Sequence, residues 1–286
     1  MKKTIFLFVF LLFYLIYGTA FLGKASLKIN NTRYHFLFDD AMISMKYAEN
    51  FAKGYGIKWN KSGEKVEGYT NFLWMLYMSI PHYLNIHKSK TSLFIKLSAL
   101  VFLILNLILI FKIIDNYYKG DFLLLFFALF LIAFYLPLNY WSLLGMEVSI
   151  LTLLLTIIVY LIIKSLEEKK FDIKIYFTLG MMTLIRIDMF MLFGGIILFM
   201  IFYDRHNLKK HLINGLALLI FFFIIQTVFR IWYFGEYLPN TYYLKLTGYP
   251  VLLRIARGAV NYHRKFMVYE LVFSFITFNS ANKKSG

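Results

Sequence analysis

The stretch IYFTLGMMTLIRIDMFMLFGGIILFMIFY, residues 175–203, decides how this chain can fold. It is a long apolar run whose only charged residues, Arg186 and Asp188, lie near its middle. One helix of this length would exceed the about 20 residues that cross a hydrocarbon core of roughly 30 Å. It would also hold both charges at mid-membrane, where they are costly. We therefore predict two short helices that meet near residues 186–189.

The composition places the rest of the chain in a membrane as well. Of 286 residues, 60% are hydrophobic and only 16% are charged, whereas soluble domains carry roughly 25% charged residues. The 31 Lys and Arg outnumber the 15 Asp and Glu. This surplus lies in short clusters between apolar runs, which favours basic loops at an anionic leaflet and argues against a nucleic-acid-binding protein. Because cysteine is absent, a disulfide framework, a zinc–thiolate site and a cysteine nucleophile are excluded.

Further apolar runs predict the other membrane spans. The run 5–21 follows two lysines, exceeds a signal-peptide core and lacks a clear cleavage site, so we interpret it as an uncleaved anchor with a cytoplasmic N-terminus. The positive-inside rule places the short basic connectors on the same side. Together the runs give seven spans, or eight. The other runs are 93–111, 122–138, 148–163 and 212–233, and the basic connectors are 112–121, 164–174 and 204–210.

These boundaries predict an all-α polytopic membrane protein in four parts. Residues 1–21 form the N-terminal transmembrane anchor, and 22–92 form a large first extracytoplasmic loop. Residues 93–278 form the transmembrane helical bundle, and 279–286 form a polar tail. Within the loop, the moderately apolar stretch 71–84 cannot cross without inverting every later connector, so we expect an interfacial or re-entrant helix there. Because the tail follows an incomplete apolar segment, we expect a shortened version of a longer architecture.

With this topology, the ionisable residues near the apolar runs gather on the outer side of the membrane. Asp39 and Asp40 open the segment DDAMISMKYAENFAKGYG, which predicts a helix capped by one of these acids and ended by Gly54. Helical spacing places Lys46 on the face of Asp39, while an apolar face is formed by Met42, Met45, Ala48 and Ala52. The other members of the outer set are Glu147, Arg186, Asp188, Arg230, Asn240 and Lys245.

Each of these residues also has an ordinary structural interpretation. Asp39 could be only a helix cap, Glu147 could be a first-turn residue favoured by the helix dipole, and Arg186 with Asp188 could close a helical hairpin. Pro239-Asn240-Thr241 could be a simple turn. The histidines show no metal-ligand spacing, and the chain has no Walker motif, no G-x-S-x-G and no dinucleotide fingerprint. The paired acids could bind a divalent ion, although their number alone does not establish one.

Taken together, the residues indicate a carboxylate-lined cavity at the outer leaflet, where Arg and Lys side chains can hold a phosphate. Such a cavity suits a lipid-phosphate substrate. The segment FDDAMISMKYAENFAKGYGIKWNKSGEKVEGYTNFLW, residues 38–74, resembles the first outer loop of GT-C superfamily membrane glycosyltransferases, in particular the mycobacterial terminal arabinofuranosyltransferase group. The later blocks Gly145-Met146-Glu147, Leu184 to Asp188 and Arg230 to Lys245 resemble blocks of that group in the same order.

This resemblance implies an enzyme that takes a sugar from a polyprenyl-phosphate donor at the outer membrane face, with inversion. Its partners would be that donor, a cell-envelope glycan or lipid acceptor, and membrane lipid, with no nucleic acid. Asp39 would act as general base with Asp40 beside it, and Glu147 would support the base or the acceptor. Donor phosphate would be held by Lys46, which stands where the family has Arg, and by Arg186, Asp188, Arg230, Asn240 and Lys245.

Two other functions remain open on the sequence. A transporter or flippase of lipid-linked substrates would use the split helices around Arg186 and Asp188. It needs charges continuing toward the cytoplasmic side, of which the spans offer none, and discontinuous segments in both halves of the chain, of which the sequence shows one. A truncated or non-catalytic component of an envelope glycosylation complex would retain the fold without the activity.

Overall fold

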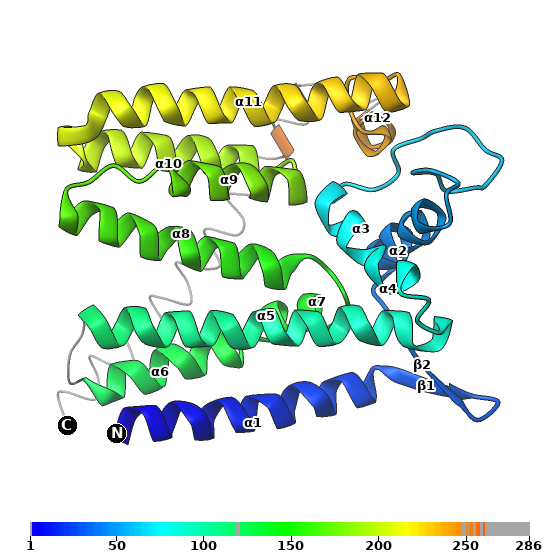
Figure 1. The fold of residues 1–286 in the computed structure, drawn as a ribbon, viewed down its shortest axis with the longest axis horizontal. Helices are drawn as coiled ribbons and strands as arrows, with labels where there is room; N and C mark the ends of the chain where they lie inside the picture. Colours follow the sequence, from blue (N-terminus) through cyan, green and yellow to red (C-terminus); the bar gives the residue numbers. More distant parts are fainter. Residues whose placement is uncertain are drawn as a thin grey trace. The chain divides into compact units, whose positions relative to one another are not determined.

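The computed structural model describes residues 2–117, 121–246, 250, 252–253, 256–257 and 260. The chain divides into two compact units, residues 1–241 and 242–286. The first unit is described here by itself, and it is mostly helical (Figure 1). The predicted apolar segment 267–278 and the polar tail 279–286 lie outside the described residues.

Four described helices are long and apolar enough to cross a bilayer, and a fifth span arises if two helices bent by 45° are counted together. The chain is therefore a membrane protein by the length and composition of its helices. The four are α1 (Lys2–Lys24), α5 (Lys88–Tyr117), α8 (Val148–Glu168) and α11 (Leu208–Phe234), which continues from η1 (Arg205–Asn207); the bent pair is α6 (Phe122–Ala133) and α7 (Leu136–Leu143).

The predicted break in the 175–203 run is confirmed. Helix α9 (Lys174–Ile185) and helix α10 (Met189–Tyr203) are separated by residues 186–188. With 12 and 15 residues, they span about 18 and 22 Å, less than a hydrocarbon core. Because the count of seven or eight spans included both, it exceeds the four or five that helix length supports among the described residues. Both helices pack on each other and on α11, and Gly180 leaves room for the Phe222 ring.

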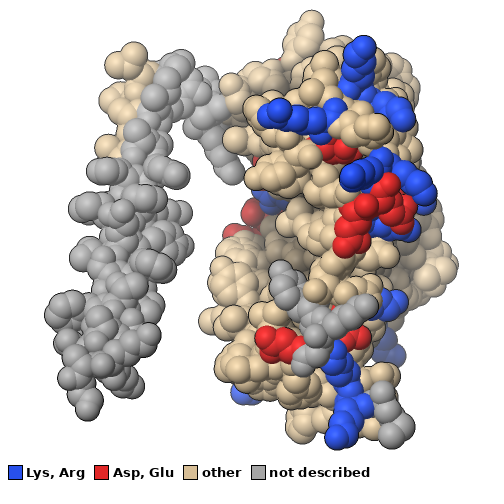
Figure 2. All heavy atoms as spheres, turned by 90° about the vertical axis from the view of Figure 1, so that its left-hand side faces the viewer, with Lys and Arg blue, Asp and Glu red and all other residues tan. Residues whose placement is uncertain are grey.

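The connectors of this unit sort into two opposite ends (Figure 1). The start of α1 lies at one end with the α8–α9 and α10–α11 connectors, and the α7–α8 connector lies at the other with the break at 186–188. The sequence predicts this grouping, because the positive-inside rule assigns the N-terminus and the basic connectors to one side of the membrane. Figure 2 looks onto the first end, where basic side chains gather beside acidic ones. Its ion pairs are Lys3–Asp115, Lys164–Glu168 and Lys170–Glu168.

The segment between α1 and α5 carries an element that the all-α prediction missed. Strands β1 (Ser26–Ile29) and β2 (Thr32–His35) form an antiparallel hairpin, and Asn30 and Asn31 at its turn have φ of 45° and 64°. Asparagine tolerates this left-handed conformation, which suits a two-residue hairpin turn. The buried ammonium of Lys96 in α5 donates to the carbonyls of Ala25 and Phe36, at 3.0 and 3.2 Å, and so joins the two ends of the hairpin.

Helix α2 (Asp39–Ala52) confirms the predicted helix but corrects its N-cap. Phe38 is the N-cap, and Asp39 and Asp40 are the first two helical residues. Gly54, with φ of +79°, follows the helix end as predicted. Met42 is 56% exposed, because the helix packs through a different stripe against its neighbours in the same loop. The buried residues of α2 are Ala41, Ser44, Tyr47, Ala48 and Asn50.

The stretch 71–84 forms two short helices, α3 (Phe72–Met78) and α4 (Ile80–Tyr83). Neither is long enough to cross a bilayer, as predicted. Helix α3 packs against α2 and α9, and its buried residues Trp74, Met75 and Met78 share one hydrophobic core with Ile95 of α5 and Ile185 of α9. The loop core is therefore continuous with the helical bundle.

Candidate functional site

Glu147 lies at the centre of a polar network at the end of the unit that carries α2. It is the N-cap residue of α8 and is completely buried. One carboxylate oxygen accepts from Nη1 of Arg186 at 2.8 Å, and the other accepts from the side-chain amide of Asn71 at 2.8 Å. Both oxygens of this buried acid are therefore hydrogen-bonded, as burial requires.

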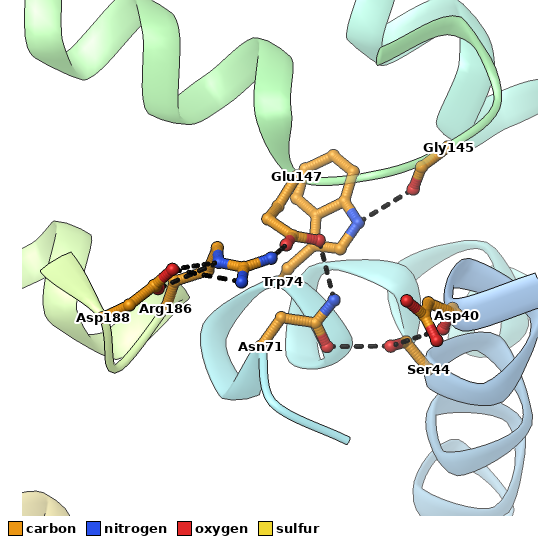
Figure 3. A network of polar contacts seen from close by, with 8 residues as sticks. All are labelled: Asp40, Ser44, Asn71, Trp74, Gly145, Glu147, Arg186 and Asp188. Carbon is orange, nitrogen blue, oxygen red and sulfur yellow. Dashed lines mark hydrogen bonds and ion pairs between the residues drawn. The ribbon is translucent and has the colours of Figure 1, made fainter. Parts of the chain in front are cut away.

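Arg186 joins the second acid of the predicted set to this centre. Its Nε and Nη2 donate to the two carboxylate oxygens of Asp188, at 2.9 and 3.1 Å. The guanidinium fork thus binds Asp188 while Nη1 remains on Glu147 (Figure 3). This arrangement stabilises the two charges that interrupt the 175–203 run, because the planar guanidinium of Arg186 donates two charge-assisted hydrogen bonds to the carboxylate of Asp188.

A chain of hydrogen bonds extends from Glu147 to the start of α2. The Ser44 hydroxyl donates to the amide oxygen of Asn71 at 2.8 Å, and it lies 3.2 Å from the main-chain carbonyl of Asp40 (Figure 3). Asp39 and Asp40 are both exposed, and Asp39 accepts from the Asp40 amide at 2.9 Å. Within the described ranges, neither acid forms an ion pair with Lys or Arg. The structure therefore joins Glu147, Arg186 and Asp188 through their side chains, and it reaches Asp40 through the main-chain carbonyl of that residue, while the side chains of Asp39 and Asp40 stay exposed.

Main-chain contacts hold the start of α2 against the α7–α8 connector. The Phe38 amide donates to the Leu144 carbonyl at 2.9 Å, and the Trp74 indole donates to the Gly145 carbonyl at 3.0 Å. Gly145 has φ of +93°, and a Cβ atom there would lie 2.5 Å from the Leu37 side chain. This glycine is therefore required both by its backbone conformation and by the close approach.

Gly145→Ala is expected to lower the free energy of unfolding by about 1–3 kcal/mol, because alanine is strained at this φ and meets Leu37. The measurement is thermal unfolding in detergent. Gly194→Ala is the matched control, since a Cβ there meets nothing within 4 Å in the interior of α10 and alanine favours helix. Equal unfolding temperatures for the two variants would contradict the role of Gly145.

Lys46 does not join this network. Its ammonium pairs with Glu49 at 3.4 Å, and Glu49 also pairs with Lys53 and with Lys88. The helical spacing placed Lys46 correctly on α2, but it could not reveal that a carboxylate one turn away competes for its charge. A donor phosphate would therefore have to compete with Glu49 for Lys46.

The Glu49 cluster predicts a measurable pH dependence. The hydrogen bond from Lys53, together with the nearby Lys46 charge, lowers the pKa of Glu49 from 4.5 to about 2. A lowered folded-state pKa means that ionised Glu49 stabilises the fold above pH 4.5, and that this contribution disappears as the pH falls toward 2. The unfolding-temperature difference between the wild type and Glu49→Gln should shrink over that interval. A difference that stays constant, or that matches Glu168→Gln, would contradict this assignment.

Arg230 and Asn240 meet at a different acid, Glu67. Nε of Arg230 donates to the Glu67 carboxylate at 2.6 Å, and both side chains are only 9% exposed. Burial raises the pKa of Glu67, although Arg230 acts to lower it. The main-chain N–H of Asn240 donates to the main-chain carbonyl of Glu67 at 3.3 Å. Arg230 is thus buried and paired instead of open to a phosphate, and the side chain of Lys245 lies outside the described part of the chain.

Sequence reasoning missed the residues that connect the predicted ones. Asn71 bridges α2 to Glu147, Glu67 neutralises Arg230, and Ser44 begins the link to Asp40. Glu67 and Asn71 belong to the VEGYTN segment, which is part of the family resemblance, but nothing in the segment predicts that they pair with Arg230 and Glu147. Within the described residues, no group of three or more His, Cys, Asp or Glu could hold a metal ion.

No family model, no curated protein and no solved structure matches this chain. Membership of the glycosyltransferase superfamily is therefore a proposal that depends on the motifs and on the site geometry.

Proposed function

We propose that this chain is a GT-C-type membrane glycosyltransferase that moves a sugar from a polyprenyl-phosphate donor to a cell-envelope glycan or lipid acceptor. In this proposal the N-terminus is cytoplasmic and the site faces the extracytoplasmic side. The supporting observation is that two exposed acids open α2, and that the main-chain carbonyl of Asp40 is connected through Ser44, Asn71 and Glu147 to the Arg186 guanidinium at the break between two apolar helices. A base-assisted displacement on a phosphate-linked sugar requires an accessible carboxylate to take the acceptor proton and a positioned cation to stabilise the leaving phosphate.

The proposed reaction proceeds by one in-line displacement. Asp39 accepts the proton of the acceptor hydroxyl, whose oxygen attacks the anomeric carbon of the donor sugar. The bond from that carbon to the phosphate oxygen breaks, and polyprenyl phosphate leaves with the bonding electrons. Glu147 and Asp188 keep the Arg186 guanidinium in place but use only three of its five N–H donors, and its side chain is 34% exposed, in contrast to the buried Arg230. The remaining donors of Arg186 stabilise the charge that develops on the leaving phosphate. Asp40 lies beside the base and shares its exposed position.

The direct test is reconstitution of the full chain in liposomes with a mixed pool of radiolabelled polyprenyl-phosphate sugars and a membrane glycolipid extract. We expect label to pass into the glycolipid fraction only when the protein is present. Mass spectrometry of lipid-linked sugars and envelope glycans, with and without the gene, then identifies donor and acceptor. If neither fraction changes, the glycosyltransferase proposal is wrong.

A transporter of lipid-linked substrates is a second candidate, because buried polar groups continue toward the opposite end of the unit. Tyr176 and His211 lie 2.7 Å apart, and His211 contacts the Asp204 carboxylate at 2.9 Å. Between these groups and Arg230, the amide of Gln226 donates to Thr183 at 3.0 Å. The transporter function predicts movement of a fluorescent polyprenyl phosphate across a liposome membrane without transfer of its sugar.

A further inference from the structure

A cavity lies beside α2, and its lining includes no residue of the Glu147 network. Its volume is about 430 Å³, within the range of small-ligand sites. Ile43 and Tyr47 of α2 form one wall, the loop between α2 and α3 supplies Trp59, Asn60 and Glu64, and Asn240 completes the lining. Ile43 is one helical turn after Asp39, so the helix face that forms this wall also carries the proposed base.

The walls of this cavity are anchored by buried side chains of α2. The amide of Asn50, which is completely buried, donates to the carbonyls of Lys58 and Trp59 at 2.8 and 2.7 Å. The hydroxyl of Tyr47, which is 2% exposed, donates to the Val66 carbonyl at 2.8 Å and accepts from the Gly68 amide at 3.1 Å. These bonds hold both ends of the loop, so the cavity is formed before any ligand binds.

The lining combines an aromatic surface with uncharged amides and one carboxylate. Trp59 is 45% exposed, with its ring 6.0 Å from that of Tyr47. The side chains of Asn60, Glu64 and Asn240 form no hydrogen bond to other described residues, so their donors and acceptors are available to a ligand. A sugar ring matches this set, because its C–H face packs on an aromatic ring while its hydroxyls both donate and accept.

Charge separates this cavity from a phosphate site. Its lining contains no Lys or Arg. Two lysines of the same loop contact other rings, with the ammonium of Lys61 4.9 Å from the Tyr55 ring centre and that of Lys65 4.5 Å from Tyr233. A phosphate here would meet the Glu64 carboxylate without a lining cation, which is unfavourable. The chemistry therefore favours the uncharged sugar of the acceptor over the phosphate of the donor.

We propose that this cavity binds a neutral sugar ring of the acceptor, stacked on Trp59 and hydrogen-bonded by Asn60 and Glu64. The inference rests on the proposed glycosyltransferase function, which it deepens by assigning the acceptor to a named site. A sugar ring bound in this cavity would lie on the face of α2 that carries Asp39, with a hydroxyl directed toward that proposed base.

The test uses saturation-transfer difference NMR on the full chain in nanodiscs. The probes are the methyl glycosides of glucose, mannose, galactose and arabinose, each added alone. At least one glycoside should give saturation-transfer signals from its ring C–H protons. Trp59→Ala should raise the Kd of that glycoside by roughly tenfold, the scale of one lost aromatic contact. Trp59→Phe should retain most of the binding. Trp232→Ala is the matched control, because Trp232 is 77% exposed on α11 and does not line the cavity.

Three results would overturn the inference: no glycoside signal that depends on Trp59, equal losses in Trp59→Ala and Trp232→Ala, or displacement of the glycoside by inorganic phosphate. In the transfer assay, Trp59→Ala should raise KM for the acceptor with little change in kcat, and a rise confined to the donor KM would also overturn it. If the wild type binds a glycoside through Trp59 but transfers no sugar, the sugar site is retained and the transferase function is wrong. If transfer occurs without Trp59-dependent binding, only the sugar site is wrong.

Discussion

Asp39→Asn is expected to lower the rate of sugar transfer by about 10²–10⁴-fold, the usual contribution of a general base. Asparagine keeps the size of the side chain, and its oxygen can still accept from the Asp40 amide, but it cannot take the proton of the acceptor hydroxyl. The variant should insert into membranes and unfold at nearly the wild-type temperature, because Asp39 is exposed. The measurement is initial transfer rate in liposomes at matched protein content.

Asp172→Asn is the matched control for this substitution. Asp172 belongs to the α8–α9 connector, which lies at the opposite end of the unit (Figure 1). Its carboxylate accepts from the Lys174 main-chain amide at 2.9 Å, so it has a comparable local role without access to the proposed site. Its transfer rate should equal that of the wild type. A wild-type transfer rate in Asp39→Asn as well as in Asp172→Asn would show that Asp39 is not the base. If only Asp40→Asn lowered the rate, Asp40 would be the base.

Arg230→Ala is expected to produce the largest loss of stability, about 3–5 kcal/mol, because it leaves the buried Glu67 carboxylate without its cation. Both partners are only 9% exposed, so the Glu67 carboxylate would remain largely desolvated after the loss of the guanidinium. The pair also joins α11 to the loop before α3, and the loss should therefore loosen the loop first. Unfolding in detergent by heat, with limited proteolysis of the 58–68 loop, measures both effects.

The control for the Arg230 pair is Lys164→Ala. Lys164 and Glu168 lie 3.8 Å apart and are about half exposed, and such surface pairs contribute within about 1 kcal/mol. The double variant Glu67→Leu, Arg230→Met should recover much of the lost stability, because it removes both buried charges. A single Arg230→Ala variant as stable as Lys164→Ala would show that the Arg230–Glu67 bond contributes little.

Several features could be predicted because they depend on short stretches of sequence. The break at 186–188 follows from two charges inside an apolar run, and the end of α2 follows from Gly54. The β1–β2 hairpin was not predicted, since its four-residue strands are too short for a periodic signal and are secured from a distance by Lys96. Likewise, the buried stripe of α2 is set by what packs on it, which local hydrophobicity does not record.

The candidate site shows the same division. Its charged members could be selected individually, because a charge next to an apolar run is costly and therefore conspicuous. Their partners could not, since Asn71, Ser44 and Glu67 are ordinary polar residues until the fold places them opposite a buried group. Lys46 and Arg230 carry the positive charge expected of phosphate ligands, but in the fold Glu49 pairs with Lys46 and Glu67 pairs with Arg230.

Apolar runs and their charged interruptions were therefore enough to identify a helical membrane protein, to locate its broken segment and to sort its connectors into two groups. These properties are local, because they depend on the cost of exposing polar groups to hydrocarbon. Which acids remain open and which are neutralised was decided by tertiary packing, because an ion pair depends on two residues being within about 4 Å. In this protein, Glu67 and Arg230 meet across 163 positions of the chain, and only the fold brings them together.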